Sequence, residues 1–585
     1  MGIPSYFRKL VDNYKGLICR NKPGAVGWLM FDFNCLMYHV LRRPDCPVYV
    51  ADRKAVWEAA FLDEIARYTL KVIRQAEPVR GVYIAIDGVA PMAKIKQQRM
   101  RRFKVGESAS PGGDSSAAVG SLIAPPNPPS GGDSLALAPP NPPSGGDSLA
   151  LAPPNPPSHG TISDIGVDCA GIPPETGVRG RERSEAPPWD KNALTPGTAF
   201  MAAVSARLQK LIRDHQPAGQ RWLLSDTTEA GEGEQKIVAQ MRAGLCEGSE
   251  GVVVYGLDAD LIVLSLWTRA THMAGRPMWL FRERIERGEM VRNAVGEEQF
   301  EWFSIGILED AVCEGRAAAD RLPYLQDYCA AMMLLGNDFL PTSMTFRLKE
   351  GGHPRLLELV EKARKAATGG RLWTAGSGLD LKGWQVGLQY LSYGEEGRFK
   401  RAVEKKLMAK GDDNDPEDEP LRVKADAVFM EKSTGELVDG WRQLYAQIAF
   451  GGEAGRREAV EKYIEGLTWI VDYYTGRPIS MEWFYPWHFP PLWEDVAAGL
   501  KVGGWRAPPT PGERGLRPVE QLAMVLPLRS WSLIPAGEPV RRLPELAPEW
   551  FPERYELQSI GKRFAWECEP EIPIPTPAQV WAVVG

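Results

Sequence analysis

Seven acidic residues lie directly after apolar, β-branched segments of this 585-residue chain, or at the start of the helical segment that follows. Apolar runs of that kind are typical of buried strands, and the carboxyl ends of parallel strands meet at one edge of a sheet. We therefore expect the seven carboxylates to converge in one crevice, where they would repel one another unless cations lay among them. They are Asp32, Asp87, Glu232, Glu234, Asp258, Asp260 and Asp338.

The chemistry of such a crevice follows from its ligands. A set of carboxylate oxygens favours Mg²⁺, or Mn²⁺, over zinc. Two such ions about 4 Å apart activate a water and stabilise the leaving oxygen in phosphodiester hydrolysis. For any one of these acids alone, a helix cap or a surface charge is the simpler interpretation. The repeated position at strand ends is what favours a metal site.

A helix with an unusual basic face is predicted directly after Asp87, in the segment that ends at Lys104. Four of its polar side chains are spaced i, i+4, i+7 and i+8, which places them on one face. Beside a carboxylate, such a face suggests a site that holds both a metal and a phosphate. The alternative is a solvated basic helix behind a core strand. The four residues are Lys94, Gln98, Arg101 and Arg102.

The elements that must position these residues alternate between strand and helix. The strands are short and wholly apolar, which indicates an α/β fold with a parallel sheet covered by helices on both faces. We predict strands at 28–32, 82–87, 221–226 and 251–258, and helices at 6–14, 54–76, 200–212 and 324–335.

The pattern changes from about residue 346. Helices are predicted at 355–369 and 386–408, and beyond Trp441 the chain is dense in Trp, Tyr and Pro. We expect a second, mainly helical and aromatic-rich domain at 346–585. It would pack beside a first domain built from residues 1–104 and 190–345.

Residues 105–189 differ in kind from the rest. A unit close to APPNPPSGGDSLAL begins at Ala124, repeats at Ala138 and begins again at Ala152. A segment so rich in Pro, Gly and Ser buries too little apolar surface to offset the entropy that the chain loses on ordering. We therefore predict a disordered, low-complexity insertion.

Composition excludes several classes of protein. The eight cysteines form no CxxC pair, so neither a zinc site nor a disulfide framework is indicated. The first residues contain no apolar signal segment, and no apolar run approaches the length of a membrane span. We expect a soluble intracellular protein without a membrane partner. A net charge of −6 does not argue against nucleic acid, because cationic groups can be local.

The chain resembles the Xrn-type 5′→3′ exoribonucleases. The resemblance covers nearly the whole chain except 105–189 and part of 346–435, and it rests on long motifs in a fixed order. In the first half these are MGIPSYFRKL, LMFDFN, AIDGVAPMAKIKQQRMRRFK, NALTPGTAFM, SDTTEAGEGEQKI, VVVYGLDADLIVL and LLGNDFLP. In the second half they are DGWRQLY, YIEGLTWIVDYYTG, WFYPWHFPP, PVEQLAMVLPLRSWSLIP and GKRFAWE.

The resemblance implies roles for particular residues. The core would be a PIN-like, Rossmann-like nuclease fold whose seven acids bind catalytic magnesium. The basic helix face, Lys94 to Arg102, would hold the 5′-monophosphate of the substrate. Family members stack the terminal base between a His and a Trp; Trp483 matches the Trp, while Tyr38 stands at the His position with His39 beside it. Met92 replaces a usual Arg, so substrate contacts there are in doubt.

The expected activity is that of a processive 5′→3′ exoribonuclease that degrades single-stranded, 5′-monophosphorylated RNA to mononucleotides. We expect a monomer in the cytoplasm, with the nucleus as the other compartment. One alternative is a structure-specific 5′ nuclease on DNA flaps, which endonucleolytic cutting of flap DNA would support. Another is an RNA-binding scaffold that has lost catalysis, which tight binding without metal-dependent turnover would support.

Overall fold

The computed structural model describes residues 6–104, 188–256, 258–273, 275–286, 289–408, 425–502, 514–562 and 567–585. The predicted disordered insertion lies outside these residues except for its last two. Of those two, Trp189 is buried against Trp57 and Phe200. That residue therefore belongs to the folded core and not to the insertion.

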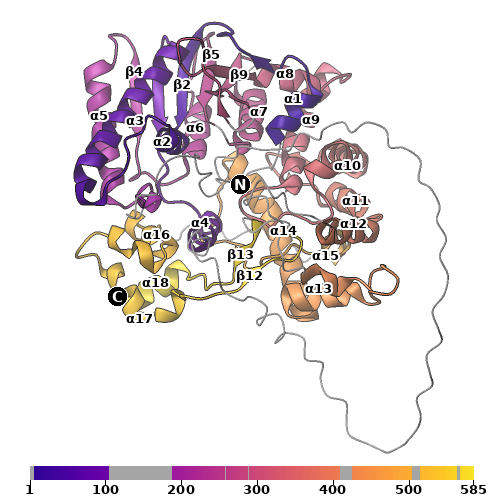
Figure 1. Cartoon of the computed structure of the whole chain (residues 1–585). Coiled ribbons are helices and arrows are strands. Elements are labelled where there is room, and N and C mark those ends of the chain that lie inside the picture. Colours follow the sequence, from indigo (N-terminus) through magenta and orange to yellow (C-terminus); the bar gives the residue numbers. More distant parts are fainter. Residues whose placement is uncertain are drawn as a thin grey trace, which may run out of the picture. The chain divides into compact units, whose positions relative to one another are not determined.

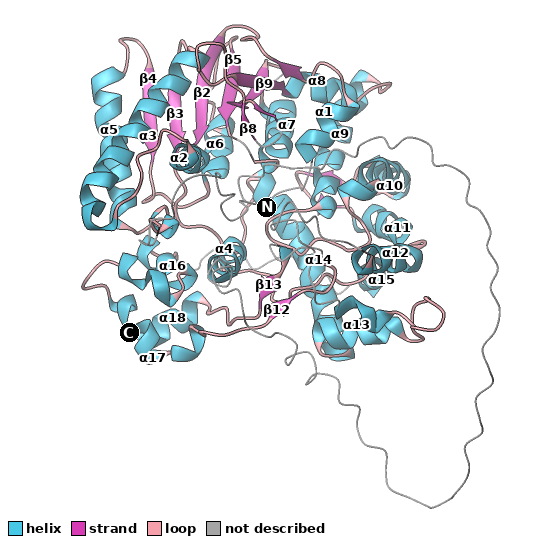
Figure 2. Ribbon diagram, viewed as in Figure 1, coloured by secondary structure: helices cyan, strands magenta, loops and turns pink. Residues whose placement is uncertain are grey.

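A seven-stranded sheet forms the centre of the first part of the chain (Figures 1 and 2). Five neighbouring strands are parallel, which confirms the predicted α/β fold. The sixth, β9, runs against both of its neighbours, so the prediction of a wholly parallel sheet was incomplete. In sheet order the strands are β1 (Ile18–Cys19), β9 (Phe300–Ser304), β6 (Met278–Glu283), β5 (Gly251–Tyr255), β2 (Val26–Asp32), β3 (Gly81–Ala85) and β4 (Arg221–Ser225).

Strand β2 lies in the middle of the sheet and is buried on both faces. Leu29 and Phe31 point into one core, and Trp28 and Met30 point into the other, as the two-residue period of a strand requires. The first core contains α2 (Phe33–Arg42), α3 (Lys54–Ala76) and α5 (Ala199–His215). The second contains α1 (Tyr6–Asn13), α6 (Gly233–Arg242), α7 (Asp260–His272), α8 (Ile305–Val312) and α9 (Ala318–Met332).

The second part of the chain is mainly helical, as predicted. The predicted helix at 386–408 is wrong in one respect, because it is two helices. Gly394 separates them with a φ of 69°, a left-handed conformation that glycine adopts easily and that ends a helix. The helices are α10 (Gly352–Ala366), α11 (Leu381–Ser392), α12 (Glu395–Leu407), α13 (Trp441–Phe450), α14 (Glu453–Thr475), α15 (Trp493–Val502), α16 (Pro518–Val525), α17 (Leu543–Leu546) and α18 (Pro577–Val584).

None of the helices in the described ranges combines the length and the apolar character of a membrane span.

The predicted basic helix is α4 (Met92–Lys104), and it packs against α16 and β13 (Glu569–Pro570) of the second part. Its apolar side chains share a core with α16. Three of its cations bind backbone carbonyls there: Lys96 those of Tyr485 and Trp487, Lys104 that of Cys568, and Arg99 those of three further residues. This face of α4 therefore joins the two parts of the chain.

Arg99→Met should destabilise the protein markedly. The guanidinium of Arg99 is fully buried and donates to the carbonyls of Met524, Trp550 and Pro573, at 2.7 Å to Met524 and 2.9 Å to Pro573. Methionine fills similar volume but leaves three buried carbonyls without a donor, at about 1–3 kcal/mol each. We expect a clear fall in the midpoint of urea unfolding. Arg74→Met, on the exposed side of α3, is the control; equal midpoints for the two variants would contradict this role.

Candidate active site

The carboxyl edge of the sheet brings four of the predicted acids to the central strands. Asp32 is the last residue of β2, and Asp87 follows β3 by two residues. Asp258 and Asp260 follow β5, and Asp260 begins α7. Strand β2 lies between β3 and β5. The chain continues from β2 to β3 and β4 on one side of it and then crosses to β5 on the other, so the strand order reverses beside β2. This is the position at which α/β folds form their ligand crevice.

The other three acids join the same cluster, as their mutual effects show. Burial, and then Asp87 and Asp258, raise the pKa of Asp32 well above its usual range. Burial, and then Glu232 and Asp260, do the same to the pKa of Glu234. Burial, Asp258 and Asp338 raise the pKa of Asp260 likewise. Each of the seven predicted acids thus lies within electrostatic reach of at least one other.

Asp87 is held by groups from two other elements. Asn34 Nδ2 donates to Asp87 Oδ2 at 2.8 Å, and Asn34 Oδ1 accepts from the Asp87 amide at 3.2 Å. The amide of Gly233, at the start of α6, donates to Asp87 Oδ1 at 2.7 Å. A Cβ at position 233 would lie only 2.9 Å from Asp32 Oδ1, so the close approach of α6 requires glycine there. Sequence analysis did not assign roles to Asn34 and Gly233.

Lys94 lies among the acids and joins two of them. Its Nζ is 2.5 Å from Glu232 Oε1 and 2.6 Å from Asp338 Oδ2. Burial would raise the pKa of Asp338, but the Lys94 ammonium is among the positive charges that hold that pKa far below its usual range. The other oxygen of Glu232 accepts a hydrogen bond from Tyr473 OH at 2.8 Å. Tyr473 is a site residue that sequence analysis missed.

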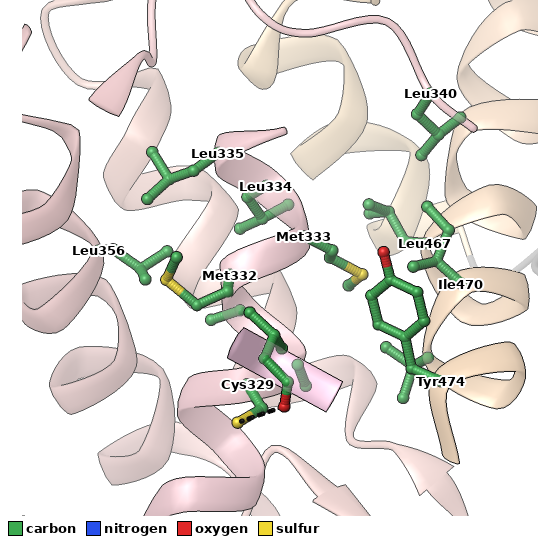
Figure 3. Packing of buried hydrophobic residues seen from close by; sticks show 14 of the residues in the cluster. Cys329, Met332, Met333, Leu334, Leu335, Leu340, Leu356, Leu467, Ile470 and Tyr474 are labelled. Carbon is green, nitrogen blue, oxygen red and sulfur yellow. Dashed lines mark hydrogen bonds between the residues drawn. The ribbon is translucent and has the colours of Figure 1, made fainter. Parts of the chain in front are cut away.

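Apolar packing fixes the turn that carries Asp338. Figure 3 shows the contact between the end of α9, with the 3₁₀ turn Met333–Leu335, and helix α14; Met333 faces Tyr474 across it. Asn337 then closes the turn: its Oδ1 accepts from the amides of Phe339 and Leu340 at 2.9 and 2.7 Å. Asp338 is thereby directed towards α4 by residues that are themselves buried.

Tyr473→Phe tests whether this hydroxyl orients Glu232. The variant removes one hydrogen bond to a buried carboxylate and little volume, so we expect a loss of about 1.5–3 kcal/mol of interaction with that group. If Glu232 must be oriented for turnover, kcat should fall about 10-fold or more while the KM for RNA stays within 2-fold. Tyr390→Phe, whose hydroxyl binds Glu358 on the surface, is the matched control. Equal rates for the two variants would contradict the role.

The donor chemistry of the cluster fits a hard divalent cation, because every acidic ligand offers oxygen. Asp258 Oδ1 and Asp260 Oδ1 are buried and accept no hydrogen bond in the structure. Over the described ranges, however, no three His, Cys, Asp or Glu side chains form a group that could hold a metal ion as they stand. The ammonium of Lys94 supplies charge to two of the acids, Glu232 and Asp338.

The other residues of α4 that were predicted to bind phosphate lie on the helix face opposite the cations that bind backbone carbonyls. Gln98 is 7% exposed and Arg102 is 8% exposed. Gln98 Oε1 and Arg102 Nη1 are buried without a hydrogen-bond partner. Burial lowers the pKa of Arg102 to about 10; Tyr38, Arg101, Asp190 and Asp87 are the charged or titratable groups around it. A buried cation with an unpaired N–H group and no carboxylate bonded to it is a favourable place for an anion.

The predicted stacking residues have different surroundings. Tyr38 is partly buried and lies near Arg102. His39 packs against α3: its ring centroid is 5.0 Å from that of Tyr68, and its side chain is 8% exposed. Trp483 is buried with its ring stacked on Trp469, centroids 5.1 Å apart.

Two family models match the chain. The first, described as XRN 5′-3′ exonuclease N-terminus, matches residues 1–275. The second, described as Xrn1 helical domain, matches residues 436–574. Together they span most of the sheet domain and most of the helical part. The chain belongs to the Xrn family.

Curated Xrn proteins align with nearly all of the chain. A protein named 5′-3′ exoribonuclease 1 from Saccharomyces cerevisiae is 24% identical over 97% of this chain and 42% of its own length. A 5′-3′ exoribonuclease 2 from Arabidopsis thaliana is 24% identical over 98% of this chain and 66% of its own length. A human protein named 5′-3′ exoribonuclease 1 is 23% identical over 98% of this chain and 33% of its own length. The chain therefore spans between a third and two thirds of these relatives.

Proposed function

We propose that the chain is a metal-dependent 5′→3′ exoribonuclease that selects single-stranded RNA with a 5′-monophosphate. The observation that carries the proposal is that buried polar residues of α4 lie close to the acid cluster at the carboxyl edge of the sheet. Arg102 is buried with its Nη1 group unpaired, Gln98 lies one helical turn before it, and Asp87 of the acid cluster lies within electrostatic reach of Arg102. A phosphate held by the first group would place the neighbouring phosphodiester near the second. The names of the curated relatives support the same activity.

The residues of α4 would fix the end of the RNA. The guanidinium of Arg102 would form charge-assisted hydrogen bonds to the terminal phosphate, and the amide of Gln98 would donate a further one. Because this pocket is walled by buried side chains, a triphosphate or a cap would not fit it. The length of one nucleotide then separates the bound phosphate from the bond that is cut.

The acids would hold Mg²⁺, with Mn²⁺ as a substitute, at Asp32, Asp87, Glu232, Glu234, Asp258, Asp260 and Asp338. When bound, such ions supply activation of a water and charge stabilisation of the leaving oxygen. The chain's own contribution is to orient the ligands. Asn34 and Gly233 fix Asp87, and Tyr473 fixes one oxygen of Glu232.

Aromatic side chains beside the phosphate pocket would stack on the first base. Tyr38 is the more accessible of the two proposed residues, and a tyrosine ring stacks on any base at about 1–3 kcal/mol. Trp483 is buried and stacked on Trp469, so it would contribute less directly, by supporting the aromatic cluster beside the site. Such contacts carry no sequence preference, which suits an enzyme that degrades whole RNA molecules.

The test compares three RNAs of one sequence that carry a 5′-monophosphate, a 5′-hydroxyl or a 5′-triphosphate, in Mg²⁺ and in EDTA. We expect mononucleotides from the 5′-monophosphate RNA alone, and only with Mg²⁺. Degradation of all three RNAs at one rate would exclude the phosphate pocket. Cutting at internal positions first would instead support an endonuclease.

A further inference from the structure

Lys94, one of the predicted phosphate ligands, binds two protein carboxylates in this structure. Its ammonium lies 2.5 Å from Glu232 Oε1 and 2.6 Å from Asp338 Oδ2, and its side chain is 18% exposed. Gln98, one helical turn further along α4, faces the same side, and side chains four residues apart on a helix lie about 5–6 Å apart at Cβ. The flexible Lys94 side chain can therefore reach either the acids or the phosphate pocket.

The two cations that this site would use need the same oxygen atoms. A divalent ion bound to Glu232 and Asp338 takes up the lone pairs that now accept from Lys94. It would also lie too close to the ammonium, because both carry positive charge. The metal can therefore take these oxygens only if the ammonium of Lys94 moves away from them.

We propose that Lys94 competes with the catalytic metal for Glu232 and Asp338, and that metal binding releases Lys94 to grip the 5′-phosphate. The inference rests on the proposed function, because it assumes that the pocket beside Gln98 and Arg102 takes that phosphate. It makes Lys94 a positioning residue that links two sites. Without metal, the phosphate pocket lacks one of its cations; with metal, the pocket is complete.

Thermodynamic linkage makes the consequence measurable. If metal improves the binding of the 5′-phosphate, the 5′-phosphate improves the binding of metal by the same factor. Couplings of this kind are typically about 5–150-fold. The enzyme would then bind productive RNA ends tightly only when it is ready to cut them.

The experiment measures binding and not turnover. The probes are two trinucleotides whose linkages are methylphosphonates, one with a 5′-phosphate and one with a 5′-hydroxyl. The ratio of their dissociation constants isolates recognition of the terminal phosphate, because every other contact cancels. It is measured by calorimetry in EDTA and in Mn²⁺, at one ionic strength. In the wild-type chain we expect Mn²⁺ to raise this preference for the 5′-phosphate at least 5-fold.

Lys94→Met should abolish that rise, so that the preference is the same with and without Mn²⁺. Lys96→Met is the matched control: Lys96 lies on the same helix, but it binds the carbonyls of Tyr485 and Trp487 and not the acids. Lys96→Met should keep the rise. Thermal unfolding checks that both variants fold. If Lys94→Met does not fold, Lys94→Gln takes its place, and a wild-type preference that is independent of Mn²⁺ overturns the competition in either case.

The outcomes separate the competition between Lys94 and the metal from the proposed 5′-phosphate pocket itself. A wild-type preference that is large but independent of Mn²⁺ overturns the competition and leaves the phosphate pocket intact. A rise that persists in Lys94→Met also overturns it, because the metal would then act directly on the phosphate. Equal binding of both trinucleotides in every condition overturns the proposed pocket itself.

Discussion

Asp258→Ala should lose RNA degradation by at least about 10³-fold and yet fold normally. Asp258 acts on the pKa of Asp32, Glu234 and Asp260, so it lies at the centre of the acid cluster. A catalytic metal contributes several kcal/mol to the transition state, and each 1.36 kcal/mol is about 10-fold in rate. Asp258 Oδ1 accepts no hydrogen bond, so the structure loses nothing there.

The same substitution should raise stability when no metal is present. Removal of one carboxylate relieves repulsion on the three that remain beside it, so the thermal midpoint in EDTA should rise by a few degrees. In Mg²⁺ the order should reverse, because the wild-type chain gains stability from the bound ion and the variant gains less.

Asp226→Ala provides the matched control for Asp258→Ala. Asp226 also follows a strand, β4, but its Oδ1 accepts from Thr228 N at 2.9 Å and closes a turn. Its removal should cost about 1 kcal/mol of stability and leave the rate within 2-fold. Residual activity of Asp258→Ala near that of Asp226→Ala would remove Asp258 from the metal site.

Arg102→Met should remove most of the preference for 5′-monophosphate RNA. Hydrogen bonds to a charged partner contribute about 1.5–3 kcal/mol, so kcat/KM for that RNA should fall about 10–100-fold. The rate on 5′-hydroxyl RNA should change little, because it has no terminal phosphate for Arg102 to bind. The measurement is the ratio of kcat/KM for the two RNAs.

Stability distinguishes Arg102 from Arg99, three residues earlier on α4. Arg99 donates to three carbonyls, whereas Arg102 is buried with its Nη1 unpaired. Arg102→Met removes a buried cation whose pKa is already lowered to about 10 by burial, so the protein should be as stable as the wild type or more so. A loss of stability as large as that of Arg99→Met, with no change in RNA preference, would make Arg102 a structural residue.

The sequence predicts the positions of the acids well, because strand ends and helix starts are local features. Hydrophobic period and flanking glycines suffice to place Asp32 at the end of β2. They also place the basic residues of α4 on two faces, since a helix repeats every 3.6 residues. These local patterns do not show which residues each face of α4 contacts in the folded chain. Lys94 meets Asp338, 244 residues later, only because α4 packs inside the completed fold.

Some residues of the site were within reach of sequence reasoning and others were not. Asn34 stands two residues after Asp32 at the start of α2, so its approach to the next strand end could have been anticipated. Tyr473 lies 241 residues from Glu232, and its role depends on the packing of α14. Strand β9 was missed because its sequence, FEWFS, is not a wholly apolar run.

The central claim is that the acid cluster binds catalytic metal next to the 5′-phosphate pocket. A crystal of the Asp258→Asn variant or of the wild-type chain, grown with Mn²⁺ and a 5′-phosphorylated trinucleotide with methylphosphonate linkages, tests it directly through the anomalous scattering of manganese. We predict one or two manganese peaks among the seven acids in the wild-type crystal, with the terminal phosphate on Arg102. Manganese bound elsewhere, or a terminal phosphate that does not contact α4, would contradict the account.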